Sequence, residues 1–151
     1  MFIYSQTQSN NHLFNRFFLS VSGWGRGAGK GPWIMADLEN GLWAGNEKVG
    51  SKDIPMTFDY VTAMVKGDSN NHFALKGGNA QAGSLQTLYD GPRPARYSPM
   101  KKQGAIILGI GGDNTNDAVG TFHEGVITAG YASDAADARV HANIVAAGYG
   151  Q

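Results

Sequence analysis

The segment WIMADLENGLWAG, residues 33–45, is largely apolar, and apolar and polar side chains alternate in it from Ala36 to Glu39. In an extended strand successive side chains point to opposite faces of the sheet. Asp37 and Glu39 then share one face, and apolar side chains occupy the other. Charged groups are seldom buried without partners, because losing hydration costs several kcal/mol per ion in rough terms. The pattern therefore predicts a strand with one core face, and its other face is either a solvated surface or a functional site.

A second alternating pattern covers residues 57–79, TFDYVTAMVKGDSNNHFALKGGN, in which two β-rich runs flank the turn sequence GDSN. Such an arrangement is typical of an antiparallel hairpin. The alternation divides the first run between two faces: Tyr60, Thr62 and Met64 on one, and Val61, Ala63 and Val65 on the other.

Shorter patterns fill the rest of the chain. GAIILGIGG, residues 104–112, is an apolar run ended by paired glycines and predicts a buried strand that enters a turn. TFHEGVITAG, residues 121–130, repeats the strand pattern. SLQTLYDGPRPARYSPM, residues 84–100, contains three prolines and predicts mostly a surface loop.

One helix is expected near the C-terminus. SDAADARVHANIVAAGYG, residues 133–150, has a Ser-Asp start, an alanine-rich interior and a glycine near its end. The spacing of its apolar residues predicts that Val140, Ile144 and Val145 pack inward.

Composition supports an all-β fold of one domain. The chain has 151 residues, 42% of them hydrophobic, which is enough to bury a core. Its 22 glycines suit short strands joined by tight turns. Twelve basic and twelve acidic residues give a formal net charge of zero, so neither nucleic acid nor an anionic membrane is the expected partner. No apolar run reaches the ~18 residues that a membrane span needs.

Several kinds of site are excluded or disfavoured. The chain has no cysteine, which excludes disulfides, zinc ribbons and thiol nucleophiles. Its histidines lack metal-ligand spacing, and we interpret them as surface or packing residues: His12, His72, His123 and His141.

A further carboxylate follows the apolar run of residues 104–112. Asp113 comes directly after GIGG. Glycoside hydrolysis needs two carboxylates that flank one bond, one to attack or stabilise the sugar cation and one to protonate the leaving oxygen. The alternative for Asp113 and Asn114 is a turn, because both residue types tolerate left-handed backbone and cap it. The residues alone favour the turn and leave the catalytic interpretation open.

Three tryptophans lie in or near the acidic segment: Trp24, Trp33 and Trp43. Flat rings with a polar edge suit stacking on sugar faces, but tryptophan is also a common core residue. For any single tryptophan the core is the favoured location, and proximity to the paired acids in sequence shifts this only a little toward a sugar site.

Four blocks of sequence together resemble a known family. They are WGRGAGKGPWIMADLENGLWAG, LKGGNAQAGSL, KKQGAIILGIGGDNTNDAVGTFHEGVITAGYASDA and ANIVAA, in this order. Over about residues 24–149 they closely resemble the catalytic domain of α-L-arabinofuranosidase B, the family 54 glycoside hydrolases. The resemblance implies a concanavalin-like β-sandwich, similar to a jelly roll, and a retaining mechanism. It also implies removal of terminal arabinofuranosyl groups from arabinoxylan or arabinan.

The resemblance assigns roles to particular residues. Glu39 in DLEN matches the nucleophile of the family, and Asp113 in GGDN matches its general acid/base. Four more residues match those that line the arabinose subsite: Trp24, Asp37, Asn40 and Gly112. No metal or organic cofactor is implied, since this mechanism needs only two carboxylates and water.

Members of the family carry about as much catalytic domain again before the matching blocks, and usually an arabinose-binding β-trefoil domain after them. We therefore expect residues 23–151 to be the C-terminal part of the catalytic β-sandwich. Residues 1–22 are expected to be unrelated or disordered. A sandwich cut through its middle exposes strand edges, so aggregation or pairing with another chain through these edges is also expected.

The family's activity implies arabinofuranosyl polysaccharides or oligosaccharides as substrates and an extracellular location. Residues 1–22 make a poor secretory signal peptide, because their one basic residue, Arg16, interrupts a short apolar patch. An alternative from another class of function is a non-catalytic sugar-binding β-sandwich that keeps Trp24 and Asp37. A third is an inactive fragment.

Overall fold

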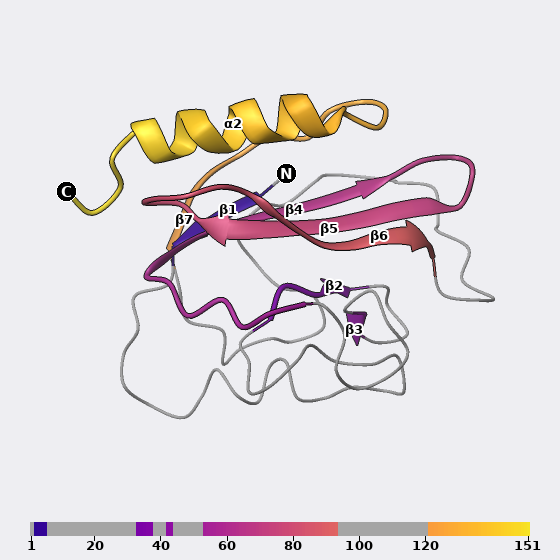
Figure 1. Cartoon of the computed structure of the whole chain (residues 1–151), viewed down its shortest axis with the longest axis horizontal. Helices are drawn as coiled ribbons and strands as arrows, with labels where there is room; N and C mark the ends of the chain where they lie inside the picture. Colours follow the sequence, from indigo (N-terminus) through magenta and orange to yellow (C-terminus); the bar gives the residue numbers. More distant parts are fainter. Residues whose placement is uncertain (1, 6–32, 38–41, 44–52, 94–120) are drawn as a thin grey trace.

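The computed structural model describes residues 2–5, 33–37, 42–43, 53–93 and 121–151, and every structural statement below concerns these residues. They form a five-stranded antiparallel sheet in the order β6-β5-β4-β1-β7, a two-stranded sheet of β2 and β3, and one helix, α2. The strand bounds are β1 Phe2–Ser5, β2 Ala36–Asp37, β3 Leu42–Trp43, β4 Tyr60–Gly67, β5 His72–Asn79, β6 Gln86–Pro92 and β7 Thr121–Gly125. Helix α2 spans Asp134–Ala146 and lies across one face of the larger sheet, while β2 and β3 lie on the opposite side (Figure 1).

Strands β4 and β5 form the predicted antiparallel hairpin, paired from Val61↔Asn79 to Gly67↔Phe73. The turn between them is held by Asp68, whose carboxylate accepts hydrogen bonds from the backbone N–H of Asn70 at 2.8 Å and of His72 at 2.9 Å. These bonds stabilise the ionised form, so the pKa of Asp68 is lowered, chiefly by the bond from His72. The sequence pattern therefore identified the hairpin correctly.

The prediction of a surface loop over residues 84–100 is wrong for Gln86–Pro92, which form strand β6. The prolines of residues 84–100 suggested an irregular segment, but Gln86–Pro92 pairs antiparallel with β5, from Gly77↔Gln86 to His72↔Pro92. The run QTLY carries β-forming side chains, and the first proline comes only at the last residue of the strand, where a missing N–H costs little. Proline therefore ends the strand here and does not prevent it.

Strand β1 pairs antiparallel with β4 on one side and with β7 on the other. It belongs to the 1–22 segment that we expected to be unrelated or disordered, so the structure differs from that expectation at Phe2–Ser5. The other residues of the segment lie outside the described part of the chain, and the boundary at residue 23 stays a prediction.

The two faces of the larger sheet are chemically different. On the face toward β2 and β3, a cluster of buried apolar side chains forms the core: Met56, Val61, Phe73, Leu75 and Leu88. Ile34, Phe58 and Tyr89 pack against this cluster. The face toward α2 instead carries buried polar groups, among them Thr62, Lys66 and Lys76. Successive side chains of β4 and β5 point to opposite faces of the sheet, so the apolar and the polar set lie on different faces.

Helix α2 begins where the sequence predicted it. The hydroxyl of Ser133 accepts a hydrogen bond from the backbone N–H of Ala136 at 3.2 Å, and Asp134 and Asp137 in the first turn complement the helix dipole. Gly148, with a φ of 70°, adopts the left-handed conformation just after the helix end.

The buried face of α2 is more polar than predicted. Its buried residues are Asp137, His141 and Ile144. Burial of Ile144 is confirmed, and Val145 is partly buried, but Val140 is 36% exposed, so its predicted inward packing is wrong. The spacing of Asp137, His141 and Ile144 follows one face of a helix. An apolar pattern could not reveal this face, because two of its three residues are polar.

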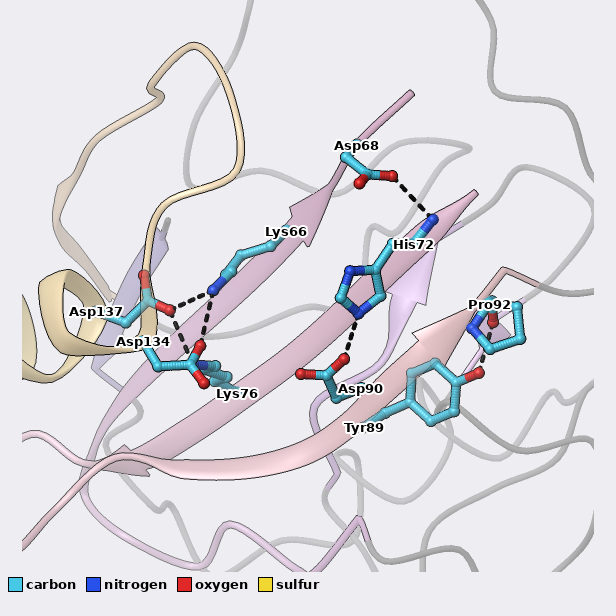
Figure 2. Close-up of polar contacts among 9 residues, drawn as sticks. All are labelled: Lys66, Asp68, His72, Lys76, Tyr89, Asp90, Pro92, Asp134 and Asp137. Carbon is cyan, nitrogen blue, oxygen red and sulfur yellow. Dashed lines mark hydrogen bonds and ion pairs between the residues drawn. The ribbon is translucent and has the colours of Figure 1, made fainter. Parts of the chain in front are cut away.

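Four charged side chains anchor α2 to the sheet (Figure 2). Lys66 Nζ lies 2.6 Å from Asp137 Oδ2 and 3.1 Å from Asp134 Oδ1, and Lys76 Nζ lies 2.9 Å and 2.5 Å from the same two atoms. Burial pushes the pKa of Lys76 down, but the hydrogen bonds with Asp134 and Asp137 outweigh it and the net direction is up. Lys76 therefore stays charged beneath the helix, and Lys66 shares the same two aspartate partners.

The four charges predict an unequal response to two matched substitutions. Asp137→Asn should lower the free energy of unfolding by about 3–5 kcal/mol, because it leaves two buried ammonium groups with a weaker partner. Asp134→Asn should cost much less, because the Asp134 side chain is 71% exposed while that of Asp137 is 6% exposed. Urea unfolding followed by circular dichroism measures both variants, and equal losses would contradict the assignment.

Candidate functional site

Strands β2 and β3 frame the predicted catalytic segment. They pair antiparallel, with Ala36 opposite Trp43 and Asp37 opposite Leu42. The chain therefore reverses between them, and the single continuous strand expected over residues 33–45 is wrong. The sequence contains a signal for this reversal, the turn-favouring pair Asn40-Gly41, which the apolar alternation obscured.

Most predicted site residues lie outside the described part of the chain. Glu39 and Asn40 belong to residues 38–41, which join β2 to β3, and Trp24, Gly112 and Asp113 also lie outside the described residues. The backbone of Asp37 is placed, as the last residue of β2. The structure therefore shows what supports β2.

That support comes from the residues just before β2. Trp33 is 3% exposed, and Ile34 packs against the core cluster of the larger sheet. Ile34 reaches this cluster where β5 carries Gly77, which has no side chain to exclude it. The chain that leads to Asp37 is thus seated on the apolar face of the sheet, on the side opposite α2 (Figure 1).

A histidine and a carboxylate pair on the other face of the sheet. His72 on β5 contacts Asp90 on β6 through Nε2 and Oδ1 (Figure 2). The ring of Tyr131 stacks on His72, with ring centroids 4.9 Å apart, and Lys66 Nζ lies 4.2 Å from the centre of the Tyr131 ring. These contacts join the hairpin end to the chain just before α2. No serine, threonine or cysteine side chain belongs to this group of described residues, and we interpret it as structural.

A second polar group lies at the edge strand β7. The hydroxyl of Tyr149 donates to Glu124, and this bond raises the pKa of Tyr149 to about 12. The rings of Tyr60 and His123 lie 5.9 Å and 5.2 Å from that of Tyr149. The group holds the C-terminal residues against the start of β4.

Two buried groups titrate abnormally. Burial raises the pKa of Asp53 from 3.8 to about 8. Burial also lowers the pKa of His141, whose Nδ1 lies 3.1 Å from Thr62 Oγ1. Its Nε2 has no hydrogen-bond partner in the described structure and is buried beside Gly78. His141 is therefore a neutral packing residue, in agreement with its predicted role.

Within the described residues, no group of three or more His, Cys, Asp or Glu side chains could hold a metal ion. In the same part of the chain, no helix is long and apolar enough to cross a membrane.

Comparison with known proteins identifies the family. Residues 2–150 match the family model described as α-L-arabinofuranosidase B, catalytic. The chain belongs to this family. The match includes residues 2–22, so it extends into the segment expected to be unrelated and agrees with the placement of β1 in the sheet.

Curated relatives from fungi are about half identical to the chain. An α-L-arabinofuranosidase of Hypocrea jecorina is 53% identical over 148 residues, and a probable α-L-arabinofuranosidase B of Aspergillus fumigatus is 52% identical over the same length. Each match covers 96% of this chain and 29% of the relative. The chain thus spans less than a third of the length of these relatives.

Solved structures agree with the fold. A glutamate-to-glutamine mutant of a GH54 α-L-arabinofuranosidase, soaked with 4-nitrophenyl α-L-arabinofuranoside, matches with a TM-score of 0.74 and 43% identity. An arabinofuranosidase complexed with arabinofuranosyl-α-1,2-xylobiose matches with the same TM-score and 44% identity. Each match covers 97% of this chain and 32% of the other. These relatives are β-sandwiches, which confirms the predicted fold class.

The neutral state of His141 predicts a dependence of stability on pH. Its pKa is lower in the folded than in the unfolded chain, where it is near 6.5. The unfolded state therefore binds more protons as pH falls below about 6.5, and stability falls with it, whereas the contribution is complete above this pH. Melting temperatures at a series of pH values should show this loss in the wild type and less of it in His141→Gln. Parallel profiles for the two proteins would contradict the prediction.

Proposed function

We propose that this chain is part of a retaining α-L-arabinofuranosidase that removes terminal non-reducing α-L-arabinofuranosyl residues from arabinoxylan or arabinan. The observation that carries the proposal is the family match over residues 2–150. Two solved relatives are described with arabinofuranosides, one soaked with an aryl arabinofuranoside and one complexed with an arabinofuranosyl xylobiose. These ligands support arabinofuranosyl oligosaccharides or polysaccharides as the substrate class.

In the proposed mechanism, the carboxylate of Glu39 attacks the anomeric carbon and the bond to the leaving oxygen breaks. Asp113 gives its proton to that oxygen. The resulting glycosyl-enzyme ester is then hydrolysed by a water molecule that Asp113, now ionised, activates as a base. Two inversions at the anomeric carbon retain its configuration. The sequence blocks DLEN and GGDN support these roles.

The remaining predicted residues would bind the sugar. Trp24 offers a ring face for stacking, while Asp37, Asn40 and the backbone of Gly112 offer hydrogen-bonding groups to arabinose hydroxyls.

An extracellular location follows from the polymeric substrate, because a plant cell-wall polysaccharide cannot enter a cell intact. Matches to fungal arabinofuranosidases support this proposal.

The nucleophile is tested by comparing two glutamates. The purified 151-residue chain should release nitrophenol from p-nitrophenyl α-L-arabinofuranoside, and Glu39→Gln should lower kcat by about 10³-fold or more, because the amide cannot form the covalent intermediate. Glu47→Gln, a change of the same type outside the DLEN block, should retain activity.

Equal activity of the wild type and Glu39→Gln would reject Glu39 as the nucleophile. No release by the wild type would reject hydrolysis by this chain. Calorimetric titration with arabinose oligosaccharides would then distinguish a sugar-binding module, which gives heat, from an inactive fragment, which gives none.

Asp113 has a different expected signature. In Asp113→Ala, an aryl arabinofuranoside should still form the glycosyl-enzyme, because nitrophenolate leaves without a proton, but hydrolysis of the intermediate should slow. Azide needs no general base, so it should restore turnover and give an arabinofuranosyl azide of retained configuration. Asp117→Asn serves as the control outside the GGDN block. An azide product of inverted configuration would instead assign Asp113 as the nucleophile.

A further inference from the structure

Gly77 occupies a crowded position in the centre of the hairpin. It lies on β5, opposite Ala63 of β4 and Gln86 of β6, and it is buried. A methyl group added to its Cα would overlap Ile34 Cδ1 and would lie 3.1 Å from Met56 Cε and 3.3 Å from Leu88 Cδ1. Three apolar side chains from three segments therefore converge on the missing side chain.

Backbone conformation does not require glycine at this position. The positive-φ glycines of the described chain are Gly83, Gly130, Gly148 and Gly150, and Gly77 is not one of them. Glycine in a strand interior normally costs stability, because it adds entropy to the unfolded chain and packs nothing. Alanine would ordinarily be favoured here. The remaining physical reason for glycine is the room it gives to Ile34.

Ile34 connects this packing to the predicted sugar site. It follows the buried Trp33 and precedes β2, which ends at Asp37, two residues before Glu39. Ile34 Cδ1 lies where a side chain at position 77 would stand, so a methyl group there requires Ile34 to shift. The segment cannot move away from the sheet without losing the contacts of Ile34 with the core cluster.

We propose that Gly77 is a positioning residue for hydrolysis, which sets where the segment of residues 33–37 rests and so where the predicted catalytic segment begins. This inference rests on the proposed function for its kinetic consequence. The packing part of the inference, that Gly77 sets the position of residues 33–37, is independent of the proposed function.

The packing part is tested by hydrogen exchange. In Gly77→Ala, peptides that cover residues 33–43 should exchange faster than in the wild type, while peptides of α2, on the opposite face of the sheet, should be unchanged. Adding Ile34→Val removes the one atom that the new methyl group overlaps, so the double variant should recover most of the protection. Gly67→Ala is the matched control, since a methyl group there meets Phe73 at 3.4 Å, an ordinary contact.

The kinetic part uses the same four proteins. Gly77→Ala should lower kcat by at least about 10-fold and at most about 10²-fold, with KM changed little, because a displaced group affects the transition state more than ground-state binding. Activity should return in the double variant and remain at the wild-type level in Gly67→Ala. A loss of thermal stability alone, with kcat unchanged well below the melting temperature, would reduce Gly77 to a packing residue.

The hydrogen-exchange and kinetic measurements test the packing part and the kinetic part of the inference separately. Unchanged exchange over residues 33–43 in Gly77→Ala would overturn the inference whatever the activity. An active wild type with wild-type kcat in Gly77→Ala would overturn its kinetic part while leaving the proposed function intact. An inactive wild type would overturn the proposed function and, with it, the kinetic part.

Discussion

Strand β5 is buried on both of its faces, from Phe73 to Gly78, and the described structure is organised by this constraint. A strand in this position cannot send any side chain into water, so each side chain must be apolar, paired or absent. Leu75 is apolar, Lys76 is paired with two aspartates, and Gly77 has no side chain. The neighbouring strands and α2 supply what each of these three solutions needs.

The α2 side of β5 uses charge. Removing two lysine side chains from water has a large unfavourable free energy. Their attraction to Asp134 and Asp137 offsets it because every nitrogen–oxygen distance in the group is 3.1 Å or shorter. An apolar contact would hold α2 at many rotations and positions with similar energy. The four ion pairs between the two lysines and the two aspartates instead form together only when the helix lies in one position. We interpret the group as a device that fixes where α2 lies, rather than as a large source of stability.

Patterning predicted the parts of the fold that rest on local information. The β4–β5 hairpin has alternation and turn residues, and α2 has a capping serine, so both were expected from sequence. Prolines concealed β6, whose strand character depends on pairing with β5. Val140 was expected inside because it is apolar, but the inward positions belong to Asp137 and His141, whose partners come from distant strands.

The candidate site shows the same division. Alternation placed Asp37 and Glu39 on one side of a strand and marked them as unusual, yet it missed the reversal that brings Asp37 opposite Leu42. The predicted catalytic roles of Glu39 and Asp113 came from the resemblance of whole blocks, because no local pattern links two residues so far apart in the sequence. Gly77 lies in the block LKGGNAQAGSL, but no local pattern shows why a glycine stands there. Its meaning depends on Ile34, which reaches it only in the folded chain.

Adjacent residues of β5 therefore serve opposite layers of the protein. Lys76 points to α2 and Gly77 lies against the chain that leads to Asp37, because successive residues of a strand face opposite sides. The two faces of the sheet share one backbone. The ion pairs of Lys76 with Asp134 and Asp137 therefore limit how far β5 can shift. The contacts of Lys76 with the aspartates of α2 therefore also bear on the position that Gly77 leaves open for Ile34. The helix side of the sheet thus stabilises the surface against which Ile34 packs, three residues before the end of β2.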